Sequence, residues 1–178
     1  MISPLSDDDG ARFKRGLLVH RLLQSLPDIA LDEREARAKV FLARPSLELE
    51  AKEQEALLAE TLSVLGGPDH ADLFGPGSMA EVPITGIVGD PETGQVLTGQ
   101  VDRLLVTKDA VTVIDFKTNR PPPETEAQVN PRYLRQMAAY RAALQAIYPD
   151  RPVRAVLLWT LGPRLMPLSD EILAAHAP

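Results

Sequence analysis

Apolar residues in the first 65 positions recur every three or four residues, a spacing typical of amphipathic helices. It predicts helices over residues 12–26, 32–43 and 46–65. Pro27 ends the first helix, Asp32-Glu-Arg-Glu35 has the form of a capping box that opens the second, and Gly66-Gly67-Pro68 ends the third. The polar run at residues 6–10 is typical of a solvated segment leading into a helix, so we assign residues 1–10 to a linker.

After residue 80 the period of the apolar positions changes to two, which indicates strands. Strands are predicted over residues 81–88, 95–106, 110–118 and 153–160, with a turn at 90–94. A helix over residues 129–148 follows the extended run Pro121-Pro-Pro123, and Ser169 is expected to cap a short terminal helix. This order predicts an α/β fold in which helices flank a mixed sheet, with a helical segment at the N-terminus. Residues 11–178 are expected to form a single domain.

The composition is that of a globular domain, because 44% of the 178 residues are apolar and 25% are charged. The apolar runs fall short of the roughly 20 residues of a membrane span, and the first ten residues lack a signal-peptide pattern, so we expect a cytoplasmic protein without a membrane partner. The chain has no cysteine, which excludes disulfides, thiolate catalysis and an iron–sulfur cluster. It contains no phosphate-loop motif, so we expect no ATP site. Any metal must therefore be bound by oxygen or imidazole.

The net charge of −6 is distributed unevenly along the chain. Residues 1–98 carry 9 Lys and Arg against 17 Asp and Glu, a net −8, whereas residues 99–178 carry 10 against 8, a net +2. The second half contains the strongest chemical motif. Its charge permits a nucleic-acid partner without arguing strongly for one.

The segment Val111-Thr-Val-Ile-Asp-Phe-Lys-Thr118 carries the most informative pattern of the chain. Alternate residues of a strand share a face, so Asp115 and Lys117 point the same way. On the preceding segment, which we expect to be the neighbouring antiparallel strand, Gly99-Gln-Val-Asp102 brings a second carboxylate toward the first. Two carboxylates a few ångströms apart repel each other by about 4 kcal/mol at an effective dielectric of about 20, so they require a proton or a divalent cation. The pattern favours a Mg²⁺ site that cuts a phosphodiester.

Each of these residues also has an ordinary structural explanation. Asp115 and Lys117 would fit a salt bridge at a strand end. His20, which lies among leucines in a helix, would fit a core histidine. Gln136 and Tyr140, four residues apart on one helix, could hydrogen-bond each other or line the core.

Five elements nevertheless occur in a fixed order: His20, Glu81, Gly99-x-x-Asp102, Asp115-x-Lys117 and Gln136-x-x-x-Tyr140. From about residue 16 to residue 160, this order resembles the RecB-like branch of the PD-(D/E)XK nuclease superfamily. More narrowly, the segments at residues 15–24, 73–84 and 114–119 are similar to the C-terminal nuclease domains of the AddA family of helicase-nuclease subunits. The resemblance implies a restriction-endonuclease-like fold, and the chain looks like a nuclease domain excised from a larger helicase-nuclease.

The resemblance also implies a role for each residue. The metal ligands would be His20, Asp102, Asp115 and the main-chain carbonyl of Phe116, with Glu81 contacting the metal or its water. Without the resemblance, Glu81 would be an ordinary charge on an edge strand. Asp102 fills the acid position of the family's PD element, although Val101 replaces the proline. The catalytic residues would be Asp102, Asp115, Lys117, Gln136 and Tyr140, the last two fixing the lysine or a DNA phosphate.

The activity implied is Mg²⁺-dependent hydrolysis of DNA, with Mn²⁺ able to substitute. It would be exonucleolytic on strands fed by the helicase portion of the same polypeptide, together with an AddB-like second subunit, in double-strand-break repair and recombination. A noncatalytic DNA-binding or scaffolding domain that retains the nuclease fold is the alternative from another class. A third possibility is an unrelated phosphoesterase, which would not require Gln136 and Tyr140.

Overall fold

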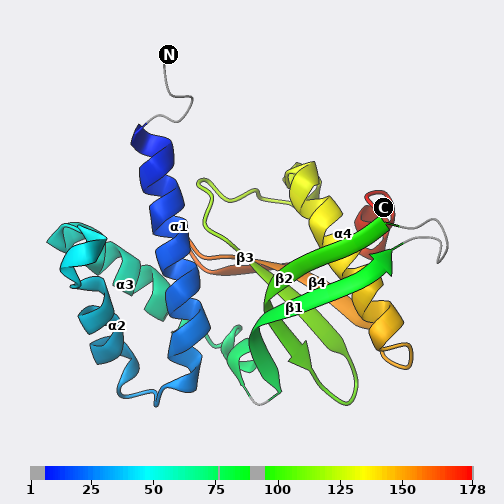
Figure 1. Ribbon diagram of the computed structural model, residues 1–178, viewed down its shortest axis with the longest axis horizontal. Coiled ribbons are helices and arrows are strands. Elements are labelled where there is room, and N and C mark those ends of the chain that lie inside the picture. Colours follow the sequence, from blue (N-terminus) through cyan, green and yellow to red (C-terminus); the bar gives the residue numbers. More distant parts are fainter. Residues whose placement is uncertain (1–6, 76, 89–94, 178) are drawn as a thin grey trace.

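The computed structural model describes residues 7–75, 77–88 and 95–177 of the chain (Figure 1). The helices are α1 (Asp7–Ser25), α2 (Arg34–Leu42), α3 (Ala51–Gly66), α4 (Pro131–Ile147) and α5 (Asp170–Ala174), and the strands are β1 (Ser78–Val88), β2 (Gln95–Val106), β3 (Val111–Lys117), β4 (Val153–Trp159) and β5 (Arg164–Pro167). Short 3-10 helices cover Leu26–Asp28, Pro45–Leu47, Ala71–Phe74 and Glu126–Gln128.

The strands form one sheet in the order β1-β2-β3-β4-β5. Strands β3 and β4 are parallel, because α4 carries the chain back between them, and the other neighbours are antiparallel. The predicted mixed sheet with flanking helices and an N-terminal helical segment is confirmed, and the fold is restriction-endonuclease-like. The expected strands match β1 to β4 closely.

Alternation along β3 and β4 divides the buried residues between two cores, one on each face of the sheet. Ile114 and Phe116 of β3, with Val156 and Leu158 of β4, pack with the leucines of α1 to α3. Odd-numbered positions, such as Val113 on β3, pack with α4 and α5 instead. Figure 1 shows α1 to α3 grouped beside the sheet, while α4 crosses over its strands. The central strands are therefore covered by helices from both ends of the sequence.

The N-terminal helices differ from the expectation at their ends. Helix α1 begins at Asp7, so its first turn occupies part of the segment 1–10 that we assigned to a linker, and residues 1–6 lie outside the described chain. The expected capping box at residues 32–35 is wrong, because Glu33 is the N-cap of α2 and makes no side-chain cap bond.

Helix α3 is shorter than predicted, since the segment from Pro45 forms a 3-10 turn and the N-cap is Glu50. A capping box does occur here, between Glu50 and Glu53, and the backbone at Glu48 is left-handed, which separates the turn from the helix. Glu50 thus caps α3. The acid-x-x-Glu pattern occurs at residues 32–35 and at residues 50–53, and only the second forms a capping box, so the pattern alone does not identify the start of a helix.

Strand β5 was missed because Arg164 to Pro167 is a four-residue edge segment without apolar alternation. The expected turn at 90–94 lies outside the described residues. Ser169 caps α5 as predicted, accepting the main-chain N–H of Ile172 at 3.2 Å. Among the described residues, no helix is both long enough and apolar enough to cross a membrane.

Candidate active site

The sheet brings Asp102 and Asp115 to neighbouring positions at one end of β2 and β3. The antiparallel ladder pairs Arg103 with Ile114, so the next position in the same register places Asp102 opposite Asp115. Asp115 is buried, only 4% exposed, and forms an ion pair with Lys117 two residues further along the strand. The structure therefore contains the predicted acid pair with its lysine, and it also contains the salt bridge that we considered as the structural explanation.

Asp102 is held by contacts from two other parts of the chain. Its Oδ2 accepts the main-chain N–H of Phe116 at 2.6 Å, and its Oδ1 lies 3.3 Å from Nδ1 of His20 on α1. The His20 ring meets the Phe116 ring edge-on, with centroids 5.8 Å apart. Its side chain is 31% exposed, so His20 lies at the edge of the core and is not a fully buried core histidine.

Glu81 lies across from Asp102 on β1, between the paired positions Ala80–Arg103 and Val82–Val101. Its φ of 53° is in the left-handed region, which is unusual for a residue with a side chain. The alternation of faces breaks here as well: Val101 and Leu104 belong to the same core, although residues three apart on a regular strand face opposite sides. Strained backbone of this kind is frequent at functional sites.

The charges of the site perturb one another. Burial raises the pKa of Asp115 to about 6; Lys117 opposes this rise and Asp102 adds to it. Burial lowers the pKa of His20, but the hydrogen bond and charge of Asp102, together with Asp115, outweigh burial and raise it overall. Burial and Asp102 also raise the pKa of Glu81. Three acids thus share a region in which negative charge is only partly compensated.

Lys117 has a second partner that the sequence did not suggest. Its Nζ lies 3.9 Å from the ring centroid of Tyr133 on α4, and the Tyr133 hydroxyl donates to Oδ1 of Asn119 at 3.1 Å. Helical spacing puts Tyr133 on the same stripe of α4 as Met137 and Tyr140, which are buried. Tyr133 is only half-buried and faces the site. The sequence offered one sign of this: Tyr133 lies one helical turn before Gln136, on the same face of the helix as a predicted site residue.

A cavity of about 870 Å³ opens over these residues, between α1 and the ends of the strands. Its lining includes His20, Glu81, Asp102 and Lys117. The other basic side chains that line it are Arg12, Arg15, Arg21 and Arg120. The acids therefore lie in a cavity whose charged lining is mainly basic. Such a lining suits a polyanionic substrate, although the net charge of the whole chain is negative.

Gln136 and Tyr140 lie in an adjoining cavity of about 390 Å³, which shares Tyr133 with the first. Nε2 of Gln136 donates to the Tyr140 hydroxyl at 3.2 Å, and this hydroxyl donates to the carbonyl of Gln100 at 3.0 Å. A Cβ at Gly99 would come within 2.8 Å of the Tyr140 ring, so glycine allows this close approach. Gln136 and Tyr140 therefore hydrogen-bond each other, which is the ordinary structural explanation given for them above. The side chains that contact Lys117 are Asp115 and Tyr133.

A scan of family models matches residues 3–167 to the PD-(D/E)XK nuclease superfamily. The chain belongs to this superfamily. A search of curated proteins gives no match. Among solved structures, one titled "Crystal structure of SSO0001" is similar at 14% identity, covering 93% of this chain and 82% of that chain, with a TM-score of 0.35. This similarity is too low for transferring the role of any residue.

Nucleases of this superfamily generally use divalent metal ions, and the donors present fit such an ion in kind. Burial, with a smaller contribution from Asp102, raises the pKa of Asp115, so the charged carboxylate that would bind a metal ion is unfavourable there without a further cation. Among the described residues, no three histidine or acidic side chains converge as a ready metal site. His20 is paired with Asp102 and Lys117 with Asp115, so a metal ion would compete with these pairings.

Proposed function

We propose that this domain is a Mg²⁺-dependent deoxyribonuclease that hydrolyses phosphodiester bonds, with Mn²⁺ able to substitute. The observation that carries the proposal is the opposition of Asp102 and Asp115 beside Lys117, under a basic cavity, in a chain of this superfamily. Lys117 and His20 lie beside the two acids, yet the pKa of buried Asp115 is still raised. A divalent cation would therefore supply stabilisation that these side chains do not, which favours a metal site over a purely structural role.

His20, Asp102 and Asp115 would hold the ion, with the main-chain carbonyl of Phe116 and, through water, Glu81. When bound, the ion would supply a water of lowered pKa and neutralise phosphate charge. Lys117 would orient the attacking water or contact the phosphate from its place under Tyr133. Gln136 and Tyr140 would contact a neighbouring part of the strand from the adjoining cavity.

The sequence resemblance to AddA extends the proposal to a biological setting. Here the domain would act exonucleolytically on strands delivered by the helicase portion of the same polypeptide. An AddB-like subunit would complete the complex, in double-strand-break repair and recombination in the cytoplasm.

The test is incubation of the purified domain with single-stranded and duplex DNA, each with Mg²⁺, with Mn²⁺ and with EDTA. We expect cleavage with either metal and none with EDTA. Absence of cleavage under every condition, in a folded protein, would contradict nuclease function of the domain. Product lengths over time would separate exonucleolytic from endonucleolytic action.

The noncatalytic alternative is favoured by one observation, the absence of a converged three-donor group among the described residues. It predicts that DNA binds in the basic cavity and is released uncut with Mg²⁺ or Mn²⁺ present. A fluorescence-anisotropy measurement on the same samples detects binding independently of cleavage, so the two functions give different results.

A further inference from the structure

A buried carboxylate outside the acid pair joins three parts of the fold near the cavity. Glu60, on α3, has a side chain only 4% exposed. It forms ion pairs with Arg15 on α1 and, at 3.1 Å, with Arg120 after β3. Its other oxygen accepts the Thr160 hydroxyl at 2.5 Å, just past the end of β4. Glu60 is therefore held in place, and both arginines pair with it.

The charges of this cluster do not balance. Two guanidinium groups share one oxygen of Glu60, which leaves an excess of positive charge. Burial and the nearby charge of Arg120 lower the pKa of Arg15 to about 10, so each cation is unfavourable for the other. An anion that contacted both groups would relieve this repulsion.

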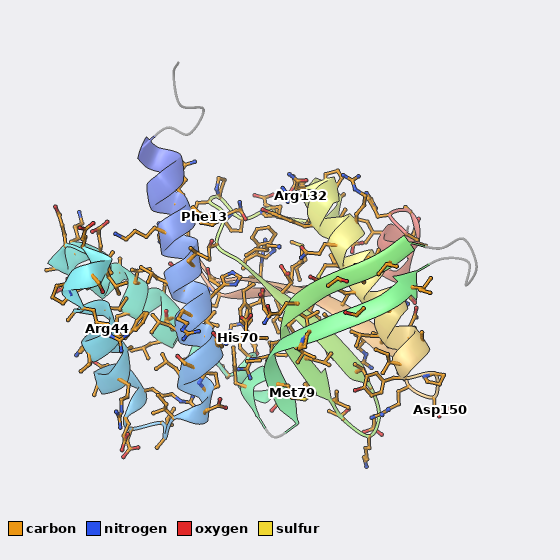
Figure 2. All side chains as sticks on the ribbon, viewed as in Figure 1. Phe13, Arg44, His70, Met79, Arg132 and Asp150 are labelled. Atoms are coloured by element: carbon orange, nitrogen blue, oxygen red, sulfur yellow. The ribbon has the colours of Figure 1, made fainter. Side chains whose placement is uncertain are left out.

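Both arginines line the same cavity as Lys117 and Asp102. Arg120 follows Lys117 by three residues, and Arg15 is one helical turn and one residue before His20. A Cβ at Gly16 would lie 3.0 Å from Oγ1 of Thr118, so glycine lets α1 approach the end of β3. Figure 2 shows side chains in the space between α1 and the sheet. The excess positive charge thus lies beside the candidate reacting centre.

We propose that Arg15 and Arg120 form a phosphate-binding site for the DNA strand next to the phosphodiester that is cut, and that Glu60 is the positioning residue of this site. The inference rests on the proposed function, because the ligand is a neighbouring phosphate of the same strand. Guanidinium groups bind phosphate oxygens in paired hydrogen bonds, so their orientation matters as much as their charge. Glu60 and Thr160 supply that orientation.

Glu60→Gln separates positioning from simple attraction. The substitution removes a negative charge from the cavity wall, so attraction without positioning predicts tighter DNA binding. Positioning predicts weaker binding, since the two arginines lose their common anchor. We expect about tenfold weaker binding of a 12-nucleotide single strand in EDTA; binding that is unchanged or tighter would overturn the role of Glu60. Circular dichroism and thermal melting show whether the variant remains folded.

Arg120→Ala tests the phosphate site itself: the Arg120 side chain is 48% exposed, so its loss opens no cavity in the core, and Arg15 still pairs with Glu60. Its matched control is Arg135→Ala, an exposed arginine of α4 that gives the same change in charge. For Arg120→Ala we expect KM to rise about tenfold with kcat within about twofold, and the slope of log affinity against log salt to fall by about 0.7. Arg135→Ala should leave both quantities near those of the parent.

If Arg120→Ala and Arg135→Ala behave alike while the parent cuts DNA, the phosphate site is refuted and the proposed function stands. If the folded parent neither binds nor cuts DNA with Mg²⁺ or Mn²⁺, the proposed function itself fails. If Glu60→Gln does not fold, the comparison of Arg120→Ala with Arg135→Ala alone tests the proposal.

Discussion

The carboxylate of Asp102 on β2 accepts a hydrogen bond from the main-chain N–H of Phe116 on the neighbouring strand β3, at 2.6 Å. One of its oxygens therefore stabilises the end of β3, while the other faces His20. Removing Asp102 would disturb the strands as well as the chemistry. Asp115 is the better probe of the site, because its side chain pairs with Lys117 and does not join the strands.

We expect Asp115→Asn to abolish cleavage, since it removes a proposed metal ligand. In EDTA the domain should be as stable as the parent or more stable at pH 7, because burial makes the charged form of Asp115 unfavourable. Retention of near-parental cleavage with Mg²⁺ would contradict the assignment of Asp115.

The same variant should change the dependence of stability on pH. The folded state raises the pKa of Asp115 from 3.8 to about 6, so it binds this proton more tightly than the unfolded state does. In EDTA the contribution of Asp115 to stability is therefore full below about pH 3.8 and is lost as the pH rises to about 6, by on the order of 2 to 3 kcal/mol. Urea denaturation at pH 4 and pH 7 measures the free energy of unfolding, which should fall less between these two pH values in Asp115→Asn than in the parent. An equal fall in the two proteins would contradict the pKa assignment.

Lys117→Ala should reduce kcat at least a hundredfold while Mn²⁺ still binds. The ammonium group ligates nothing and competes with the ion for Asp115, so metal affinity should hold or increase. Titration calorimetry measures the affinity, with Lys108→Ala, in an exposed loop, as the control for loss of a lysine charge. A loss of Mn²⁺ affinity as large as that of Asp115→Asn would make Lys117 a structural partner of the acids.

His20→Ala should weaken Mn²⁺ binding and change the stability of the apo domain by less than about 1 kcal/mol, because the imidazole is partly exposed. Val19→Ala is the matched comparison, since Val19 is fully buried and its truncation should cost about 1 to 3 kcal/mol without altering metal binding. If His20→Ala destabilises the apo domain as Val19→Ala does and binds Mn²⁺ normally, His20 is a packing residue.

Because the backbone at Glu81 is left-handed, replacing this residue can change both the stability of the domain and its affinity for metal, and two variants separate these effects. Glu81→Gly should stabilise the domain by about 1 kcal/mol relative to Glu81→Gln, because glycine adopts a φ of 53° without a steric penalty. Both variants lack the carboxylate, so any loss of metal affinity should be the same in the two. Thermal melting and Mn²⁺ calorimetry give the two quantities. Greater stability of Glu81→Gln would show that this conformation is not strained.

The sequence predicted the acid pair because a period of two defines which strand residues share a face, as for Asp115 and Lys117. It could not predict the left-handed Glu81, since the interruption of alternation depends on how two strands meet at Asp102. Glu60 was overlooked for a different reason. A glutamate in a helix rich in charged residues has the pattern of an exposed surface, and only the packing of α3 against Arg15 and Thr160 buries it.

Tyr133 shows the same limit for aromatic residues. Helical spacing places it on one stripe with Met137, and Tyr133 does pack against the same core, but it is only half-buried and its ring also meets Lys117. Spacing identifies the face of a helix on which a side chain lies and not the polar group that the side chain meets at the edge of the core. The fold was therefore more predictable than the partners of its charged residues.

The contact between His20 and Asp102 has a consequence for how the domain folds. The two residues are far apart in the sequence, so their approach closes a long loop, which is entropically unfavourable until the sheet and α1 have both formed. The pairing should be among the later events of folding. A partly folded chain would carry the acids on their strands without the imidazole, and the candidate site would be complete only after the final docking of α1.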